Sequence, residues 1–300
     1  MDKQEMQKQV TIKEVIIEIE KLRSSTVISY MAAQNALVGP EDAGMIVDTI
    51  EMILPPSRKF ERLDLFLHSP GGFLDSAYKI VRICKEYSNE FNVIVPLAAK
   101  SAATVIALGA KEILMTVFAE LGPIDPIIQH PYKPDVRVPA RSIKDFFSFL
   151  NSTESSEQIL VDPQFKSQMS SLLDPYLIGS YQTALNSSKQ IAERLLKENA
   201  LKDRPELVDD AVKKLSEYYY SHNYVIDRNE AREIGLNIIN TESVQNLDKN
   251  VRLLLGIYQQ FMTQNNVLKL VGNREINRNI QALPLVQQNA IPQKPVNLVY

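Results

Sequence analysis

Residues 63–72, with the sequence LDLFLHSPGG, decide the fold of this chain. The strand-like run Leu63 to Leu67 leads into a turn that ends on Gly71 and Gly72. The apolar residues after the turn, from Phe73 to Cys84, recur at helical spacing. A strand, a tight turn and a helix in direct succession predict a crossover unit, in which the next strand runs parallel to the first.

The same order of elements recurs around this unit. The expected helices span residues 11–24, 41–53 and 101–108, and the expected strands span residues 26–31, 91–95 and 112–116. Short strands that alternate with helices are typical of an α/β fold with a mostly parallel sheet and right-handed crossovers.

The second half of the chain has a different character. Residues 131–139 contain three prolines and predict an extended loop. Further helices are expected over residues 142–150, 163–173, 175–198, 205–219, 228–234 and 244–261, with a short strand at 224–226. The last stretch, 281–300, is rich in Pro, Gln and Asn, and predicts an extended or disordered tail.

Composition excludes several classes of protein. Hydrophobic residues make up 45% of the 300, enough for a large core, and the net charge of -3 gives no general attraction to nucleic acid or anionic membranes. The single cysteine, Cys84, excludes an internal disulfide and is expected to be an inert core residue. No apolar run approaches the ~18 residues that span a bilayer, so no stable membrane anchor and a cytoplasmic location are expected.

Two features could carry acyl-transfer chemistry. Ser101 follows a predicted strand and opens a helix of small residues, where a hydroxyl nucleophile can be presented. The Gly71-Gly72 turn can expose backbone N–H groups toward a substrate, and the N–H of Ala102 is a further candidate oxyanion donor. Each feature alone has a simpler interpretation, since glycine pairs make tight connections and serines often cap helices.

Four ordered motifs resemble the serine dehydrogenase proteinase family. They are LHSPGG at 67–72, KSAATVIALGA at 100–110, ELGPIDP at 120–126 and RNEAREIGL at 228–236. This family groups with the Clp protease proteolytic subunit, signal peptide peptidase A and the crotonases. The resemblance covers roughly residues 25–240, and implies a ββα spiral fold, Ser101 as nucleophile, oxyanion donors at Gly71, Gly72 and Ala102, and ring-like oligomers.

The general base is left open by the sequence. In the Clp subunit a histidine follows the third strand, but here Ile124 or Asp125 falls near that place, and His130 lies further along in a proline-rich segment. Relatives of signal peptide peptidase A use a lysine on a later helix. Lys144 is the first candidate and Lys189 the second, although most lysines simply occupy solvated helix faces.

Other titratable residues near these motifs have structural interpretations. His68 is expected to pack at a strand end, and a structural role is favoured for His222, although it could reach the mouth of the site. Asp125 could orient a base or cap a turn. Lys100 should point away from Ser101 if the backbone there is extended, or line the groove.

The sequence therefore predicts a serine peptidase that acts on peptides or proteins through Ser101 and a lysine base, without a cofactor or a metal. The expected organisation is an N-terminal helix (1–24), a hydrolase domain (25–240), a helical extension that could mediate oligomerisation (241–280) and a tail (281–300). A homo-oligomer, either a ring or a dimer-based assembly, is expected. Two alternatives stay open, namely a non-catalytic scaffold or peptide-binding module and a crotonase-like acyl-CoA enzyme.

Overall fold

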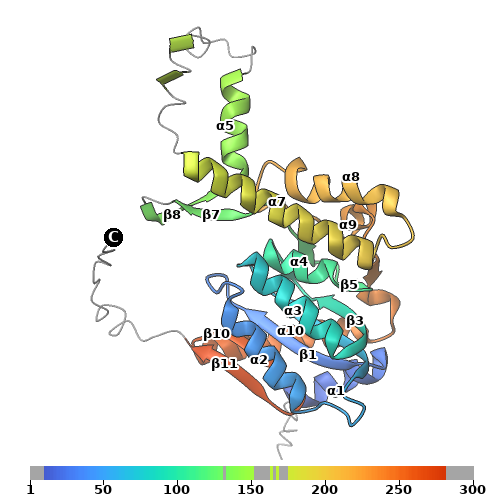
Figure 1. The fold of residues 1–300 in the computed structure, drawn as a ribbon. Helices are drawn as coiled ribbons and strands as arrows, with labels where there is room; N and C mark the ends of the chain where they lie inside the picture. The colour runs from blue at the N-terminus through green and yellow to red at the C-terminus, as the bar shows by residue number, and fades with distance from the viewer. Residues whose placement is uncertain (1–9, 131–132, 152–162, 165–166, 169–174, 282–300) are drawn as a thin grey trace, which may run out of the picture.

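A seven-stranded sheet lies at the centre of the computed structural model, which describes residues 10–130, 133–151, 163–164, 167–168 and 175–281 (Figure 1). The strand order is β11-β10-β1-β2-β3-β5-β9. Strands β1, β2, β3, β5 and β9 pair in parallel, whereas β10 pairs antiparallel with β1 and with β11. The strands span Thr26–Ala32 (β1), Phe60–His68 (β2), Ser88–Val95 (β3), Ile113–Met115 (β5), Ile238–Asn240 (β9), Val267–Gly272 (β10) and Asn277–Gln281 (β11). The predicted mostly parallel α/β sheet is confirmed.

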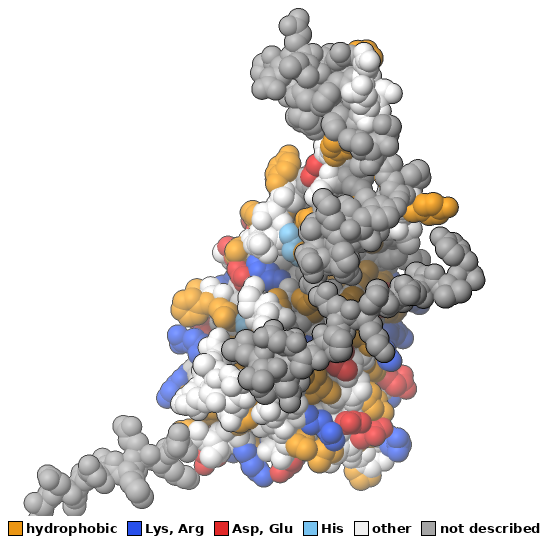
Figure 2. All heavy atoms as spheres, turned by 90° about the vertical axis from the view of Figure 1, so that its left-hand side faces the viewer, with side chains coloured by type: hydrophobic (Ala, Val, Ile, Leu, Met, Phe, Trp, Pro, Cys, Tyr) orange, Lys and Arg blue, Asp and Glu red, His pale blue; other side chains and the backbone are white. Residues whose placement is uncertain are grey.

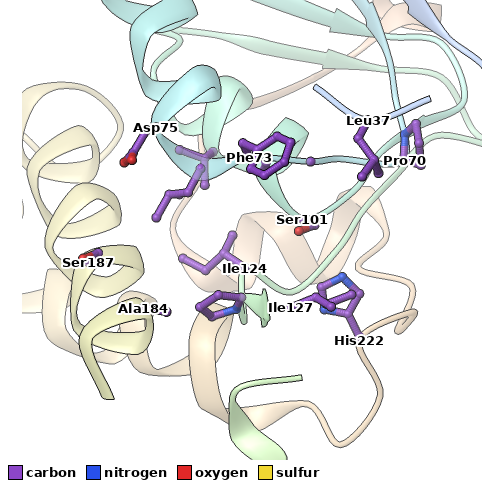
Figure 3. A pocket seen from close by; sticks show the side chains of 15 residues that line it. Leu37, Pro70, Phe73, Asp75, Ser101, Ile124, Ile127, Ala184, Ser187 and His222 are labelled. Carbon is purple, nitrogen blue, oxygen red and sulfur yellow. The ribbon is translucent and has the colours of Figure 1, made fainter. Parts of the chain in front are cut away.

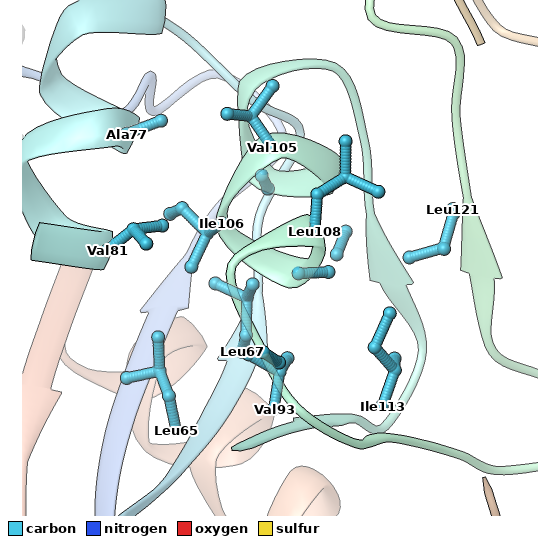
Figure 4. Close-up of a cluster of buried hydrophobic side chains, with 14 of the residues drawn as sticks. Leu65, Leu67, Ala77, Val81, Val93, Val105, Ile106, Leu108, Ile113 and Leu121 are labelled. Atoms are coloured by element: carbon cyan, nitrogen blue, oxygen red, sulfur yellow. The ribbon is translucent and has the colours of Figure 1, made fainter. Parts of the chain in front are cut away.

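Helices cover both faces of the sheet, because successive side chains of a strand point to opposite faces. Leu65 and Leu67 of β2 join a cluster with helices on one face (Figure 4), and Phe66 between them joins a second cluster on the other face. The first face carries α2 (Pro40–Glu51), α3 (Leu74–Glu86) and α4 (Ala102–Leu108), and the second carries α1 (Ile12–Arg23) and α10 (Leu247–Gln264). The run LDLFL therefore marks a strand buried on both sides, in which the buried Asp64 is paired with Arg23.

A buried ion pair fastens β10 to the start of α2. The Nζ of Lys269 lies 3.0 Å from a carboxylate oxygen of Asp42, and the two side chains are 7% and 0% exposed. Asp42 also accepts hydrogen bonds from the Tyr30 hydroxyl (2.8 Å) and the Gly39 amide (2.6 Å). A buried charge needs this full set of partners. The network therefore fixes the chain at Gly39, directly before α2.

The chain then builds a second layer beyond the ends of the parallel strands. Here β4 (Ala98–Ala99) pairs in parallel with β6 (Glu120–Leu121), and β7 (Ile127–His130) forms a hairpin with β8 (Lys133–Pro139). Figure 1 shows α5 (Arg141–Asn151) projecting from the body and α7 (Pro175–Glu198) crossing above α4. The segment predicted as an extended loop over 131–139 is thus mostly a strand, since the hairpin partner supplies hydrogen bonds that its prolines do not prevent.

The helical region after α7 is less regular than predicted. The helix expected over 205–219 is divided into a 3-10 turn, η2 (Pro205–Leu207), a short helix, α8 (Val208–Lys213), and a π turn, η3 (Lys214–Tyr218). The strand expected at 224–226 is reduced to one bridge between Leu121 and Ile226. The predicted helix α9 (Arg228–Ile234) is present, capped by Asp227 and followed by a 3-10 turn, η4 (Thr241–Ser243), after β9.

The C-terminal part differs from the expected helical extension over 241–280. Helix α10 is followed by strands β10 and β11, which extend the sheet along the edge of β1. The apolar face of α10 packs with α1 on this sheet, so it is covered within the chain rather than left for a second subunit. Most of the helix predicted over 163–173 and nearly all of the tail 281–300 lie outside the described residues.

The composition predicts an inert Cys84 and a surface without a strong net charge. Burial raises the pKa of the Cys84 thiol to about 12, which leaves it protonated and a poor nucleophile. On the face drawn in Figure 2, acidic and basic side chains are interspersed. Among the described helices, none combines the length and the apolar character needed to cross a membrane.

Candidate active site

The structure brings the glycine turn and Ser101 into contact. Gly71 has φ of +104°, a conformation that side chains rarely adopt. A Cβ at this position would lie 2.6 Å from the carbonyl oxygen of Lys100 and 2.7 Å from Cβ of Ser101. Only glycine therefore allows the turn to approach the serine this closely.

Val38, which no motif in the sequence singles out, holds the other side of the turn. Its N–H donates to the carbonyl of Gly71 (2.8 Å), and its carbonyl accepts from the N–H of Phe73 (2.9 Å). A Cβ on Gly72 would lie 2.3 Å from the Val38 nitrogen. The turn is thus clamped between two backbone segments, and Val38 directly precedes the Gly39 that Asp42 fixes.

Ser101 is held in a strained conformation with its hydroxyl free. Its φ of 50° and ψ of -119° are sparsely populated by non-glycine residues and resemble those of nucleophile turns between a strand and a helix. Among the described residues, the hydroxyl makes no hydrogen bond, and the amides of Gly72 and Ala102 donate to no acceptor. The Gly71 amide instead donates to the Ser69 hydroxyl (3.1 Å). The available donors beside Ser101 are therefore Gly72 and Ala102.

Ser101 opens onto a cavity of about 380 Å³ (Figure 3). Gly72 and Ala102 line it together with Ser101. Most of the remaining wall is apolar and comes from separate elements. It includes Leu37, Phe73, Leu74, Val105, Ile124 and Ile127.

A histidine–carboxylate pair lies at the same cavity. His222, from the loop between η3 and α9, lines the cavity opposite the glycine turn (Figure 3). Its Nδ1 lies 2.8 Å from a carboxylate oxygen of Asp125, and the two side chains are 15% and 6% exposed. The two residues are 97 positions apart in the sequence. Sequence reasoning considered each of them separately, because nothing in that spacing indicates that they meet.

The two candidate lysines lie elsewhere. Lys144 on α5 and Lys189 on α7 both form ion pairs with Glu217, and the hydrogen bonds from Lys144 and then Lys189 lower the pKa of that carboxyl to about 2. Lys144 lines a separate cavity with Glu217, and neither lysine lines the cavity of Ser101. The structure therefore does not bring Lys144 or Lys189 together with Ser101.

The remaining candidates have other surroundings. Lys100 points away from the cavity, and its Nζ binds the carbonyl oxygens of Leu121 (3.2 Å) and Tyr224 (3.0 Å). His130 is the last residue of β7, and its side chain lies outside the described part of the structure. A ring nitrogen of His68 lies 3.1 Å from the carbonyl oxygen of Ala98, and burial lowers the pKa of its imidazole, in keeping with a residue packed at a strand end.

Comparison with known proteins places this geometry in a family. A family model described as "ClpP-like SDH-type serine proteinase" matches residues 1–281. The chain belongs to this family. The resemblance seen in the four motifs and the predicted Clp-protease-like fold are thereby confirmed.

Relatives and solved structures extend the comparison. This chain is 28% identical over 263 residues to the uncharacterized protein MJ0137 of Methanocaldococcus jannaschii, covering 86% of this chain and 82% of the relative. It is 28% identical over 253 residues to MJ1495 of the same organism, covering 82% and 76%.

Two solved structures are variants of the membrane-bound stomatin-specific protease 1510-N. The first, a serine-to-alanine variant, has 14% identity and a TM-score of 0.44, covering 71% of this chain and 79% of that one. The second, a lysine-to-alanine variant in complex with a substrate peptide, has 13% identity and a TM-score of 0.44, covering 88% and 93%.

Replacement of Gly71 by alanine is expected to slow the reaction of Ser101 with a fluorophosphonate by about tenfold or more, since a misplacement of ~1 Å can cost ~100-fold in rate. The added Cβ would push on the backbone that carries the nucleophile. The measurement is the labelling rate of folded protein. Gly44→Ala in α2 is the matched control, because a Cβ there meets nothing within 4 Å. Equal labelling rates for the two variants would contradict the role of the turn.

Proposed function

We propose that this SDH-type proteinase hydrolyses peptide bonds with Ser101 as nucleophile, and that His222, oriented by Asp125, is its general base. The observation that carries the proposal is that Ser101, two free backbone amides and the His222–Asp125 pair line or adjoin one cavity. Membership of a serine proteinase family supports the reaction class.

The amides of Gly72 and Ala102 are the proposed oxyanion donors. Preorganised N–H groups stabilise the negative charge that develops on the carbonyl oxygen during attack, and this is often the largest contribution to catalysis. Both amides are free of acceptors within the described residues, and both residues line the cavity together with Ser101. Gly71, a predicted donor, would serve instead through its conformation, because its own amide is bound to Ser69.

His222 is preferred to Lys144 as the base for two reasons. A general base must be unprotonated and able to reach the proton that it removes. Lys144 and Lys189 are both paired with Glu217, outside the cavity of Ser101. His222 lines that cavity, and because its Nδ1 faces Asp125, Nε2 is the ring nitrogen left for the serine hydroxyl.

Asp125 is suited to orienting the imidazole. It is 4% exposed, and within the described residues His222 is its side-chain hydrogen-bond partner. A buried carboxylate without a partner would be costly, so the pair holds both the ring orientation and the tautomer with a proton on Nδ1. The nucleophile, the acid and the histidine follow one another along the chain as Ser101, Asp125 and His222. Unrelated hydrolases also use a triad in this order.

The proposed steps conserve protons and electrons. Ser101 Oγ bonds to the carbonyl carbon as Nε2 of His222 takes the hydroxyl proton, and the carbonyl electrons move to the oxygen beside Gly72 and Ala102. The C–N bond then breaks, and the imidazolium returns its proton to the leaving amine. A water attacks the acyl-enzyme in the same way and restores the serine.

The cavity favours a substrate with an apolar side chain beside the scissile bond. Phe73, Ile124 and Val105 present hydrocarbon to this space, and the acidic residue Asp75 lines it as well. Burying such a side chain contributes about 1.5–3 kcal/mol. The family match supports peptide hydrolysis over the acyl-CoA alternative. Comparing the turnover of wild type with that of Ser101→Ala distinguishes a peptidase from a non-catalytic scaffold.

Self-association as a homo-oligomer is proposed on a different surface from the one that the sequence suggested. The adjacent residues Val117 and Phe118 are 55% and 61% exposed, and neighbouring exposed apolar side chains often mark interfaces. Phe118→Asp is expected to lower the mass measured by light scattering at micromolar concentration. A wild-type monomer at that concentration would contradict the proposal.

Ser101 is expected to be the residue labelled by a fluorophosphonate. Wild-type protein should form a covalent adduct that peptide mapping assigns to Ser101, and Ser101→Ala should neither label nor cleave casein or a fluorogenic peptide with an apolar residue before the scissile bond. The alanine variant should fold normally, since the hydroxyl makes no hydrogen bond within the described residues. Equal, near-zero turnover by both proteins would indicate a scaffold.

Loss of His222 is expected to lower kcat/KM by about 100- to 10,000-fold, the usual contribution of general base catalysis. The measurement is kcat/KM for wild type, His222→Gln and Lys144→Gln with the same peptide. Lys144→Gln should behave like wild type; the reverse result would favour a lysine base.

A further inference from the structure

Lys100, which directly precedes Ser101, contacts several of the segments that build the proposed site. Its backbone N–H donates to the carbonyl of Ser69 (3.0 Å), at the start of the glycine turn. Its carbonyl oxygen accepts from the Ala103 amide (2.8 Å) and faces Gly71. The backbone of Lys100 therefore connects the turn, the nucleophile and the first turn of α4.

The side chain of Lys100 extends to the opposite side. Its ammonium is 3.0 Å from a carboxylate oxygen of Glu120, 3.2 Å from the carbonyl oxygen of Leu121 and 3.0 Å from that of Tyr224. The side chain is 16% exposed. Three oxygen acceptors match the three donors of an ammonium group, so the charge is fully satisfied in this position.

The acceptor at Tyr224 matters because it lies two residues after His222. The loop that carries His222 is also held by the contact of His222 with Asp125 and by the Tyr224 ring, which stacks on Tyr219 with ring centroids 4.3 Å apart. Asn223, Tyr224 and Val225 are exposed, and the nearest backbone bonds are the pair between Leu121 and Ile226. Lys100, the residue next to the nucleophile, adds a hydrogen bond from its ammonium group to the carbonyl of Tyr224 in this loop.

The structure also makes room for this side chain. A Cβ at Gly122 would lie 2.8 Å from Cδ of Lys100 and 3.5 Å from the Ser101 nitrogen. Gly122 is itself fixed to α4, since its amide donates to the Thr104 hydroxyl (3.0 Å) and its carbonyl accepts from the same hydroxyl (2.9 Å). The strand segment before Asp125 is therefore packed directly against Lys100.

From these contacts we infer that Lys100 is a positioning residue, which holds the His222 loop in register with Ser101. The inference rests on the proposed function, because it assigns Lys100 a role through the proposed base. Lys100 is not among the residues that line the cavity, so its expected role does not include binding the substrate. Its loss should therefore impair the chemical step rather than substrate binding.

The test compares Lys100→Met and Lys100→Arg in the full chain with the apolar fluorogenic peptide. Lys100→Met keeps the length of the side chain without the charge, and should lower kcat by about 10- to 100-fold with KM close to wild type, as expected for a misplaced catalytic group. Lys100→Arg keeps the cation and should recover much of the lost kcat.

Two matched controls separate this role from a general loss of stability. Glu120→Gln removes the ion pair and leaves the bonds from Lys100 to both carbonyls, so its kcat should stay close to wild type. Lys85→Met removes a partly buried lysine that bridges Glu198 and Asn199 away from the site, and should also leave kcat unchanged. A kcat in Lys85→Met as low as that in Lys100→Met would overturn the inference.

Hydrogen exchange provides a readout that does not depend on activity. In Lys100→Met, the amides of residues 219–227 should exchange faster than in wild type, whereas those of β2 and β3 should not. Unchanged exchange in this segment, or a wild-type kcat in Lys100→Met, would overturn the inference. Failure of the proposed function looks different, because wild type and Ser101→Ala would then be equally inactive while the exchange difference remained.

Discussion

Backbone contact at Gly71 and Gly72 is the constraint on which the site depends. Side-chain atoms cannot enter the space between this turn, Ser101 and Val38, since added Cβ atoms would lie well inside contact distance. The close approach sets where the free amides of Gly72 and Ala102 lie relative to the hydroxyl. The turn also links the nucleophile to Val38, which is hydrogen-bonded to Gly71. Through the neighbouring Gly39 it is linked to the buried network around Asp42.

The second half of the site is built on a different principle. The turn and Ser101 are placed by the ends of parallel strands, but Asp125 and His222 come from segments outside the main sheet. These segments are held by local ties, which include the bonds between Leu121 and Ile226 and those of Lys100. Lys100 links these two halves, because its backbone contacts the glycine turn and its ammonium binds the carbonyl of Tyr224 in the loop of His222.

The candidate lysines and the histidine lie at two different cavities. Glu217 holds Lys144 and Lys189 at one cavity, and its lowered pKa reflects the two ammonium groups around it. The cavity of Ser101 instead contains an imidazole with a buried carboxylate behind it. Ion pairing thus assigns the lysines and the histidine to separate places, although all of them lie on neighbouring helices and loops.

The sequence alone predicted strands β1, β2, β3 and β5, most helices, the family resemblance and the pairing of the LHSPGG turn with Ser101 in one candidate site, because these follow from local periodicity and from the glycines of the turn. The short strand β9 was not predicted. The β10–β11 addition was missed, since an edge strand is defined by the partner it joins. Only the tertiary structure decided which group faces Ser101. The packing of distant loops brings Asp125 and His222 together, and Lys144 is paired with Glu217 at another cavity. Neither contact can be predicted from the periodicity of the sequence.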